Sequence, residues 1–341
     1  MKVSVVILNW NGQDFLRRYL PALVKYSNLP EVEVVVADNG STDNSRDVVE
    51  NEFPTVRYLQ LDENYGFAKG YNQALAQIEA EYYLLLNSDV EVTENWLEPL
   101  IEMMDVDQSI GACQPKILQT GKPEYFEYAG AAGGFIDKFG YPFCRGRLLD
   151  VVEKDEAQYN ESGEIFWGTG ACLMVRSSVW KELDGLDAHF WAHMEEIDLC
   201  WRMKNRGYKI YYNHQSTVHH VGGGSLSYGN PRKIYLNFRN NLFLLYKNLP
   251  SSSLFPILFG RMILDGAAAL QFLVTGQVAA FRKVFMAHMA FYRHLPHLRK
   301  QRKQLLKQAT VNQHREIFGG SLVWNYYFRR KRKFNELNWR P

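Results

Sequence analysis

Residues 84–92 read LLLNSDVEV, and the fold implied by the rest of the chain can be built outward from them. The apolar run Tyr82–Leu86 stops here at a polar turn, Asn87-Ser88-Asp89. Short apolar runs bounded by turn residues are typical of strands buried on both faces of a parallel sheet. A carboxylate at the end of such a strand lies where parallel sheets bind ligands, and it can hold a hard divalent cation. The alternative is an ordinary Asn-Ser-Asp turn without a ligand.

The same pattern repeats on the N-terminal side of this strand. Three further apolar runs have strand character: Val3–Leu8, Glu33–Ala37 and Val56–Leu61. Helical patterns separate the strands: Phe15–Tyr26, Ser45–Glu52 and Phe67–Gln77. Further along, a helix is predicted at Glu195–Asn205, with strands at Phe166–Val175 and Tyr208–Tyr212. Strand–helix alternation predicts an α/β fold with a mostly parallel sheet covered by helices on both faces.

Length and charge predict two regions. The chain has 341 residues, enough for an α/β core of about 250 residues and an appendage. We predict a catalytic domain over residues 1–230 and a helical, basic region over residues 231–341, where the composition changes. Residues 299–333 hold eleven Lys or Arg and one acidic residue, Glu316, although the net charge of the whole chain is only +2. Such a basic segment predicts an anionic partner, either lipid or nucleic acid.

The longest apolar run in the chain is Ser253–Gly276, and Arg261 and Asp265 interrupt it. Charges at mid-span are costly in a bilayer, which argues against a transmembrane helix. We predict instead a segment that lies at the membrane surface, next to the basic residues that follow it. The alternative is a set of helices packed on the catalytic core or on another copy of the chain.

Cysteine usage and the N-terminus indicate the compartment. The four cysteines lie far apart, with no C-x-x-C pair, so neither a zinc site nor a disulfide framework is suggested. The first residues, MKVSVVILNW, read as a strand and lack the features of a secretory signal. We therefore expect a cytoplasmic catalytic domain.

Two more polar turns follow predicted strands. Residues 38–43, DNGSTD, come after the second strand, and residues 64–72, NYGFAKGYN, come after the third. The second of these turns places amides, a Lys and flexible glycines where a diphosphate could be contacted. In isolation, both turns also fit simple loops that lead into helix N-termini.

An acidic cluster and a histidine pair complete the candidates. Glu195, Glu196 and Asp198 repel one another unless a cation compensates or one holds a proton, and such a cluster can supply a general base. The alternative is an acidic helix start stabilised by the helix dipole. His219 and His220 can complete a metal shell begun by Asp89, or they can be structural.

The order of these patterns makes the sequence similar to a known family. From about Val3 to Gly224 it closely resembles glycosyltransferase family 2, in the rhamnosyltransferase-like and galactofuranosyltransferase-like branch of bacterial surface polysaccharide assembly. The resemblance rests on seven motifs in order: VSVVILNWNG, VVVADNGSTDNS, NYGFAKGYNQAL, LLLNSDVEV, FWGTGACLMVR, FWAHMEEIDLCWR and TVHHVGGGS. It implies a GT-A fold and an inverting glycosyltransferase that uses a nucleotide-diphospho-sugar.

Carried over position by position, the resemblance assigns three kinds of role. The nucleotide and donor sugar would be contacted by Trp10, Asp38, Asn39, Asn64, Lys69, Asn72, Asn87 and Ser88. The donor-sugar and acceptor wall would be formed by Trp167, Gly168, Thr169, Gly170 and Trp191. Mn²⁺ or Mg²⁺ would be bound by Asp89 and His220, and Glu196 would be the catalytic base, with Glu195 as its rival.

The sequence departs from the family pattern at two positions. Asn87 stands where the family's Asp-x-Asp motif has its first Asp, which removes one charge near the ribose and the metal. Glu196 stands where the family usually has Asp, so the base gains one methylene and its reach changes.

The resemblance also implies partners. The donor would be a UDP- or dTDP-sugar and the acceptor a lipid-linked glycan, at the inner face of the cell membrane. An anionic membrane surface would bind the C-terminal region, whose helices could instead form a homo-oligomer interface.

We expect no nucleic acid, because no nucleic-acid module accompanies the basic tail. A non-catalytic module that only binds sugar nucleotide is a second alternative, against which Asp89, Glu196 and His220 argue together. A nucleotidyltransferase would need a phosphate loop that residues 9–12, NWNG, do not supply.

Overall fold

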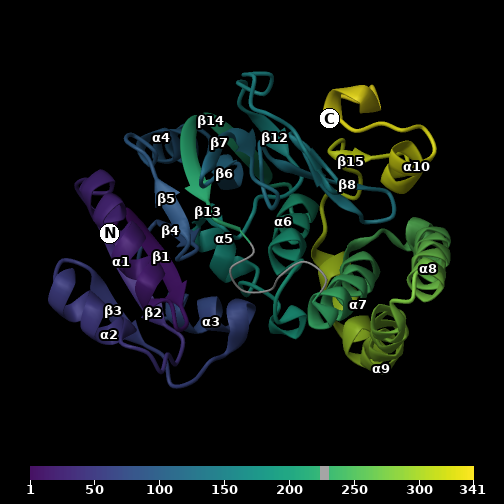
Figure 1. Cartoon of the computed structure of the whole chain (residues 1–341), viewed down its shortest axis with the longest axis horizontal. Helices are drawn as coiled ribbons and strands as arrows, with labels where there is room; N and C mark the ends of the chain where they lie inside the picture. Colours follow the sequence, from purple (N-terminus) through teal and green to yellow (C-terminus); the bar gives the residue numbers. More distant parts are fainter. Residues whose placement is uncertain (223–229) are drawn as a thin grey trace.

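The computed structural model describes residues 1–222 and 230–341 and is built around a large mixed sheet (Figure 1). One half of this sheet is parallel, in the order β3-β2-β1-β4. Its strands are β1 (Val3–Asn9), β2 (Val32–Asp38), β3 (Arg57–Gln60) and β4 (Tyr82–Leu86). The four strands predicted from residues 1–100 are therefore confirmed, with shifts of at most one residue at their ends.

Beyond β4 the sheet becomes mixed. β13 (Cys172–Arg176) is antiparallel to both β4 and β6 (Ile110–Gln119). The long strand β14 (Lys209–His220) runs parallel to β6. Three short strands extend this half: β5 (Val90–Val92) and β12 (Gly163–Ile165), both paired with β14, and β7 (Lys122–Phe126), paired with β6.

Helices cover both faces of the sheet, as the sequence predicted. They are α1 (Gln13–Tyr26), α2 (Ser45–Asp47), α3 (Gly66–Leu75), α4 (Glu98–Val106), α5 (Ser177–Glu182) and α6 (Glu195–Asn205). The alternating side chains of β1 show the two faces. Val6 belongs to one buried cluster, while Val5 and Ile7 belong to another. Successive side chains of a strand point to opposite faces, so a sheet buried on both sides gives the continuous apolar runs seen in the sequence.

A second, smaller sheet lies beside the first, in the order β11-β10-β9-β8-β15. Its strands are β8 (Gly134–Asp137), β9 (Pro142–Cys144), β10 (Arg147–Leu148), β11 (Val151–Val152) and β15 (Ile317–Phe318). Two of these strands, β8 and β9, lie in a segment rich in Gly and aromatic residues, 125–146. Gly140 and Gly146, with φ of +78° and +98°, allow the tight turns that reverse the chain there.

The C-terminal region begins with α7 (Pro231–Asn248). It continues as α8 (Ser251–Val274), α9 (Val278–Gln308) and α10 (Leu322–Tyr327). Gly276, with φ +76°, turns the chain between α8 and α9. Phe243 of α7 lies in the same buried cluster as Val6 of β1, and β15 pairs with β8. The C-terminal region therefore shares a core with the first 230 residues (Figure 1).

Candidate active site

Asp89 and His220 meet at the carboxyl edge of the parallel sheet. Asp89 follows β4 in the turn before β5, and the antiparallel pairing of β5 with β14 sets His220 opposite Val90. Nε2 of His220 lies 3.1 Å from Oδ1 of Asp89, and both side chains are buried. The strand pairing thus brings together two residues that are far apart in the sequence and were both predicted to bind the metal.

A third ionisable residue, Glu127, was missed by the sequence analysis. Its Oε1 lies 3.5 Å from Nδ1 of His220, and its Oε2 accepts a hydrogen bond from the backbone N–H of Ala129. Glu127 is only 4% exposed. No motif marks it, because it lies alone in the segment between β7 and β8 and reaches His220 only through the fold.

The two carboxylates create a strongly negative environment around His220. Burial alone would lower the pKa of the ring, but hydrogen bonds and charge from Asp89 and Glu127 outweigh it and raise the pKa of His220 to about 10. Positive charge is therefore favoured at this position. A divalent cation would take the place of that proton, so proton and metal compete for the same ring.

The donor atoms fit a hard divalent cation. Adjacent ligands of an octahedral ion at about 2.1 Å lie about 3 Å apart, which matches the separation of Asp89 Oδ1 and His220 Nε2. Carboxylate oxygen suits Mg²⁺ and Mn²⁺, and these ions are commonly held by one or two protein ligands plus phosphates of the substrate. Among residues 1–222 and 230–341, no group of three or more His, Cys, Asp or Glu is arranged to hold a metal. The protein thus provides part of a coordination shell, which suits an ion that binds together with a diphosphate.

We predict that Glu127→Gln weakens metal binding without unfolding the protein. The amide keeps the size of the side chain but removes the charge that orients the His220 ring, and loss of such a partner costs about 10- to 100-fold in metal affinity. Titration of Mn²⁺, followed by its electron paramagnetic resonance signal, measures the change. Glu124→Gln, an exposed carboxylate three residues earlier, is the matched control. Equal Mn²⁺ affinity in both variants would show that Glu127 has no such role.

The loops after β1 and β2 form a bonded unit beside this edge. Asp38 is buried and accepts hydrogen bonds from Asn9 Nδ2 (3.1 Å) and the Ser41 backbone N–H (2.8 Å). Asn39 is also buried, and its side chain bonds to the loop before α3 at Asn64, Tyr65 and Gly66. Trp10, by contrast, is 57% exposed, with its indole free to contact a ligand. The structure therefore gives Asn39 a clear role in holding the loop, whatever it contacts in a complex.

Helix α3 carries two residues that were predicted to contact the sugar nucleotide, Lys69 and Asn72, and both contact other residues of the protein. Asn72 donates to the Leu186 carbonyl (2.7 Å) and accepts from the Leu186 N–H (2.9 Å). The ammonium of Lys69 lies 4.0 Å from the centre of the Tyr65 ring, on an exposed side chain. Asn72 thus fixes the segment that leads to α6, and Lys69 remains accessible.

The segment before β13 contacts both the turn that holds Asp89 and the start of α6. The Asn87 N–H donates to the Ala171 carbonyl at 2.9 Å, and a Cβ placed on Gly170 would lie 3.0 Å from the Phe67 ring and 3.9 Å from Cβ of Glu196. Asn87 and Ser88 are half-buried beside Asp89. Of the predicted wall, Trp167, Gly168 and Thr169 lie in the interior, with Trp167 donating to the Phe135 carbonyl. Gly170, which was also predicted to belong to the wall, lies next to both Phe67 and Glu196.

The three carboxylates of the acidic cluster have different environments. Asp198 is fully buried and compensated by Arg202 (2.8 Å) and Lys247 (2.9 Å). Glu195 and Glu196, at the start of α6, each have a buried oxygen with no hydrogen-bond partner among the described residues. Asp198 therefore stabilises the fold, while Glu195 and Glu196 are the candidates for proton transfer.

Burial shifts both glutamates towards the protonated form. It raises the pKa of Glu195 well above its usual range, with a further contribution from the neighbouring Glu196 charge. Burial also raises the pKa of Glu196 to about 7, although backbone N–H groups at the start of α6 oppose the shift. Glu196 is half-buried and Glu195 only 4% exposed. Burial therefore favours the protonated form of both glutamates, and Glu196, with a pKa of about 7, can accept a proton near neutral pH.

The backbone leading into α6 is strained. Trp191, His193 and Met194 have φ of 66°, 68° and 73°, a region that non-glycine residues rarely occupy. Asn240 of α7 holds this segment, since its Nδ2 lies within 3.0 Å of the carbonyls of Phe190, Ala192 and His193. The Trp191 indole lies over Gly66, where an added Cβ would meet it at 2.8 Å. The C-terminal region thus positions the candidate base and its wall.

We predict that Asn240→Ala lowers both stability and turnover. It leaves the partly buried carbonyls of Ala192 and His193 without the Asn240 donor, which costs about 1–3 kcal/mol each in unfolding free energy, whereas the Phe190 carbonyl keeps a bond from Arg239. Relaxation of the strained segment would also displace Glu196, and misplacement of about 1 Å can cost about 100-fold in rate. Urea unfolding and kcat, measured at a temperature where the variant is folded, separate the two effects. Asn237→Ala on the same helix is the control, and wild-type turnover in a folded Asn240→Ala protein would contradict the proposed positioning.

Residues 223–229, which include Gly223 and Gly224 of the predicted glycine loop, lie outside the described residues.

Comparisons with known proteins agree with this geometry. The sequence profile described as "Glycosyl transferase family 2" matches residues 4–182. An N-acetylglucosaminyl-diphospho-decaprenol L-rhamnosyltransferase of Mycobacterium tuberculosis is 26% identical over 237 residues, which cover 64% of this chain and 76% of that protein. The low-salt glycan biosynthesis hexosyltransferase Agl10 of Haloferax volcanii is 24% identical over 261 residues, covering 74% and 78%.

Solved structures show the same fold at low identity. GalNAc-T7 with UDP, GalNAc and Mn²⁺ has a TM-score of 0.55 at 16% identity, covering 72% of this chain and 48% of that one. The mannosyltransferase PcManGT of Pyrobaculum calidifontis, in complex with GDP-Man and Mn²⁺, has a TM-score of 0.52 at 14% identity, covering 90% and 85%. The predicted GT-A fold is confirmed by these neighbours.

Proposed function

Because the chain belongs to glycosyltransferase family 2, we propose that it moves a sugar from a nucleotide-diphospho-sugar to a hydroxyl of a lipid-linked glycan, with inversion at the anomeric carbon. That the chain is a glycosyltransferase of glycan biosynthesis follows from the family and its relatives. The observation that carries the proposal is the pairing of Asp89 with His220 at 3.1 Å. The turn that holds Asp89 is bonded to Ala171, and the preceding residue, Gly170, lies next to Glu196.

Glu196 is the proposed base. Its carboxylate would accept the proton of the acceptor hydroxyl as that oxygen attacks the anomeric carbon, and the bond to the nucleoside diphosphate would break on the opposite side. One displacement inverts the centre and needs no covalent intermediate on the protein. Burial of Glu196 raises its pKa to about 7, so this carboxylate can take up a proton near neutral pH.

Asp89 and His220 are the proposed metal ligands. A bound Mn²⁺ or Mg²⁺ would neutralise charge on the diphosphate leaving group. Asp89 supplies the charged oxygen, His220 supplies a ring nitrogen, and Glu127 orients the ring from behind. The Mn²⁺ complexes of GalNAc-T7 and PcManGT support a divalent cation, without identifying the ion used here.

Donor, acceptor and location are proposed from the relatives. The name of the mycobacterial relative contains a diphospho-decaprenol acceptor, which supports a lipid-linked acceptor for this chain. TarS of S. aureus, with a TM-score of 0.51 at 18% identity, was solved with UDP. We propose a UDP- or dTDP-sugar as donor and a location on the inner face of the cell membrane.

A panel of sugar nucleotides with Mn²⁺ or Mg²⁺ tests the proposal. Released nucleoside diphosphate identifies the donor, and nuclear magnetic resonance of the product gives the configuration of the new linkage. Turnover with one donor, dependence on the metal and an inverted linkage would support the proposed reaction. Binding of a donor without turnover on any lipid-linked acceptor would instead favour a module that only binds sugar nucleotides.

A further inference from the structure

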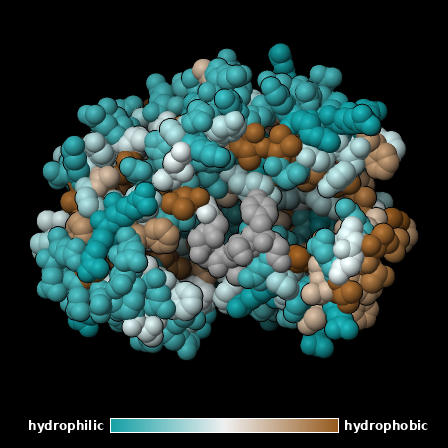
Figure 2. Space-filling view, viewed as in Figure 1, coloured by the Kyte–Doolittle hydropathy of each residue, from teal (hydrophilic) through white to brown (hydrophobic). Residues whose placement is uncertain are grey.

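One side of α8 is a continuous apolar surface. Phe255, Phe259, Ile263, Leu270 and Val274 follow one another at spacings of four or seven residues along the helix. With Leu273, these side chains are 44–79% exposed. By length and composition, α8 could cross a membrane, and 11% of its most apolar window is buried inside the protein. Figure 2 shows apolar side chains gathered at the right-hand edge of the molecule, where Figure 1 places α8. Exposed apolar surface of this extent marks a site that binds another surface.

The two charges of α8 face the opposite way. Arg261 and Asp265 are both buried and pair with each other at 2.7 Å. Arg261 also donates to the Phe139 carbonyl, while Asp265 pairs with His288 of α9 at 3.1 Å. These contacts attach α8 to the body of the protein along its inner face. The charges that interrupt the apolar run in the sequence therefore leave the outer face uncharged, and they oppose insertion of α8 across a bilayer.

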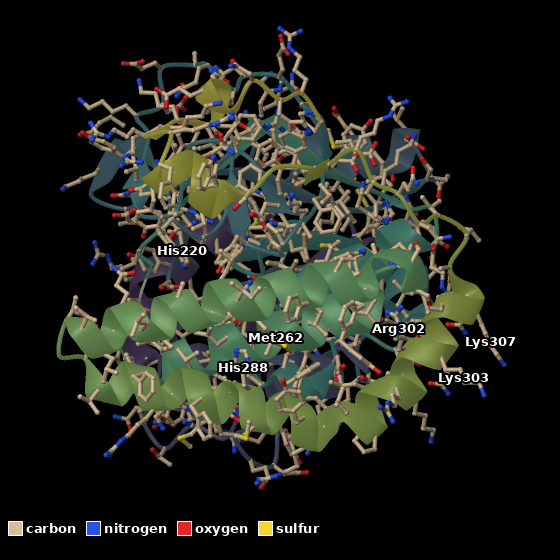
Figure 3. All side chains as sticks on the ribbon, turned by 90° about the vertical axis from the view of Figure 1, so that its right-hand side faces the viewer. His220, Met262, His288, Arg302, Lys303 and Lys307 are labelled. Carbon is tan, nitrogen blue, oxygen red and sulfur yellow. The ribbon has the colours of Figure 1, made fainter. Side chains whose placement is uncertain are left out.

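Helix α9 continues this surface and then becomes basic. It packs beside α8, and its first half exposes Val278, Phe285, Met286, Met289 and Tyr292. From there to its end, its exposed residues include Arg293, Arg299, Lys300, Lys303 and Lys307. Figure 3 looks onto the two helices side by side, with Lys303 and Lys307 at the end of α9. One face thus combines apolar side chains with a row of cations.

A shallow groove runs between the two helices. Its volume is about 250 Å³, and it is lined by Phe255, Phe259, Met262, Tyr292 and Arg299, among others. The walls are almost entirely apolar, and a guanidinium lies among them. This arrangement matches one hydrocarbon chain of a lipid whose phosphate lies near Arg299.

We propose that the α8–α9 hairpin is a membrane-docking face that lies flat on an anionic bilayer. The apolar stripe would enter the boundary between headgroups and acyl chains, and the basic half of α9 would contact lipid phosphates. A second copy of this chain would bring an equally basic row to the contact, so charge complementarity favours the lipid surface. The inference deepens the proposed membrane location and rests on it, but it does not depend on the chemistry at Asp89 and Glu196.

Flotation of the full-length protein with vesicles tests the docking face. Wild type is expected to float with vesicles of phosphatidylethanolamine and phosphatidylglycerol at low salt, and less with phosphatidylcholine alone. Phe259→Glu with Ile263→Glu should reduce the partition coefficient at least about tenfold. Val106→Glu, at an apolar residue 87% exposed elsewhere on the surface, is the control and should float like wild type. Both changes lie at exposed positions, and circular dichroism melts verify folding.

The opposite outcomes are equally clear. Failure of wild type to float with anionic vesicles would overturn the inference, as would equal flotation of the double variant. Dimers in sedimentation that the double variant dissociates, without any vesicle binding, would assign the face to a contact between copies. Release of nucleoside diphosphate with a soluble acceptor, measured on the same variants, keeps the two proposals apart. Loss of flotation with that activity intact leaves the proposed reaction standing.

Discussion

Replacement of Asp89 by Asn is expected to reduce turnover about a thousandfold or more while the protein stays folded. The amide has the size of the carboxylate and can still contact His220, which lies 3.1 Å away, but it lacks the charge that a hard cation requires. A metal at a developing phosphate charge is worth several kcal/mol in the transition state, and each 1.4 kcal/mol is about tenfold in rate. Steady-state release of nucleoside diphosphate at saturating donor measures the loss.

A matched control isolates the metal from general charge effects. Glu91, two residues further on in β5, is exposed, and Glu91→Gln should retain wild-type turnover. Raising the Mn²⁺ concentration should restore part of the activity of Asp89→Asn, because the remaining ligand still binds weakly. Full activity of Asp89→Asn at low metal would remove this residue from the site.

Much of the fold could be predicted because it depends on local patterns. The strand Tyr82–Leu86 and the helix Glu195–Asn205 have the predicted bounds, since a buried strand and a helix with an acidic first turn both leave short-range signals. The GT-A fold followed from seven motifs in order. The second sheet was not predicted, because its strands are short and β15 joins β8 from almost the other end of the chain.

The site could be predicted only where a motif marks it. Asp89 and His220 each close a strand-like run, and the fold brings them together as expected. Glu127 and Asn240 carry no motif, and their roles come from contacts with residues distant in the sequence. The sequence also could not predict that Arg261 and Asp265 face the interior of the protein, because a charged residue in an apolar helix can face either lipid or protein. Such long-range pairings are set by packing, which periodicity does not report.

Replacement of Glu196 by Gln is expected to reduce turnover by about 10²- to 10⁴-fold, the usual contribution of a general base. The amide fills the same space but cannot accept the acceptor proton. Wild-type kcat/KM should rise with pH and level off above about 7, because burial raises the pKa of Glu196 to about 7 and the carboxyl must lose its proton before it can act as a base. A pH profile of nucleoside diphosphate release measures both effects, and the rising limb should disappear in Glu196→Gln.

Glu195→Gln decides between the two neighbouring glutamates. Burial raises the pKa of Glu195 well above its usual range and so favours the uncharged form of its side chain, which Gln imitates. We therefore expect Glu195→Gln to keep turnover within about tenfold of wild type and to keep the rising limb near pH 7, since the state of Glu195 seen by Glu196 is unchanged. Larger loss in Glu195→Gln than in Glu196→Gln, with the limb abolished, would exchange their roles. That outcome would make the more deeply buried carboxyl the base, and it would require α6 to rotate or the strained segment at Trp191–Met194 to open before the acceptor could reach it.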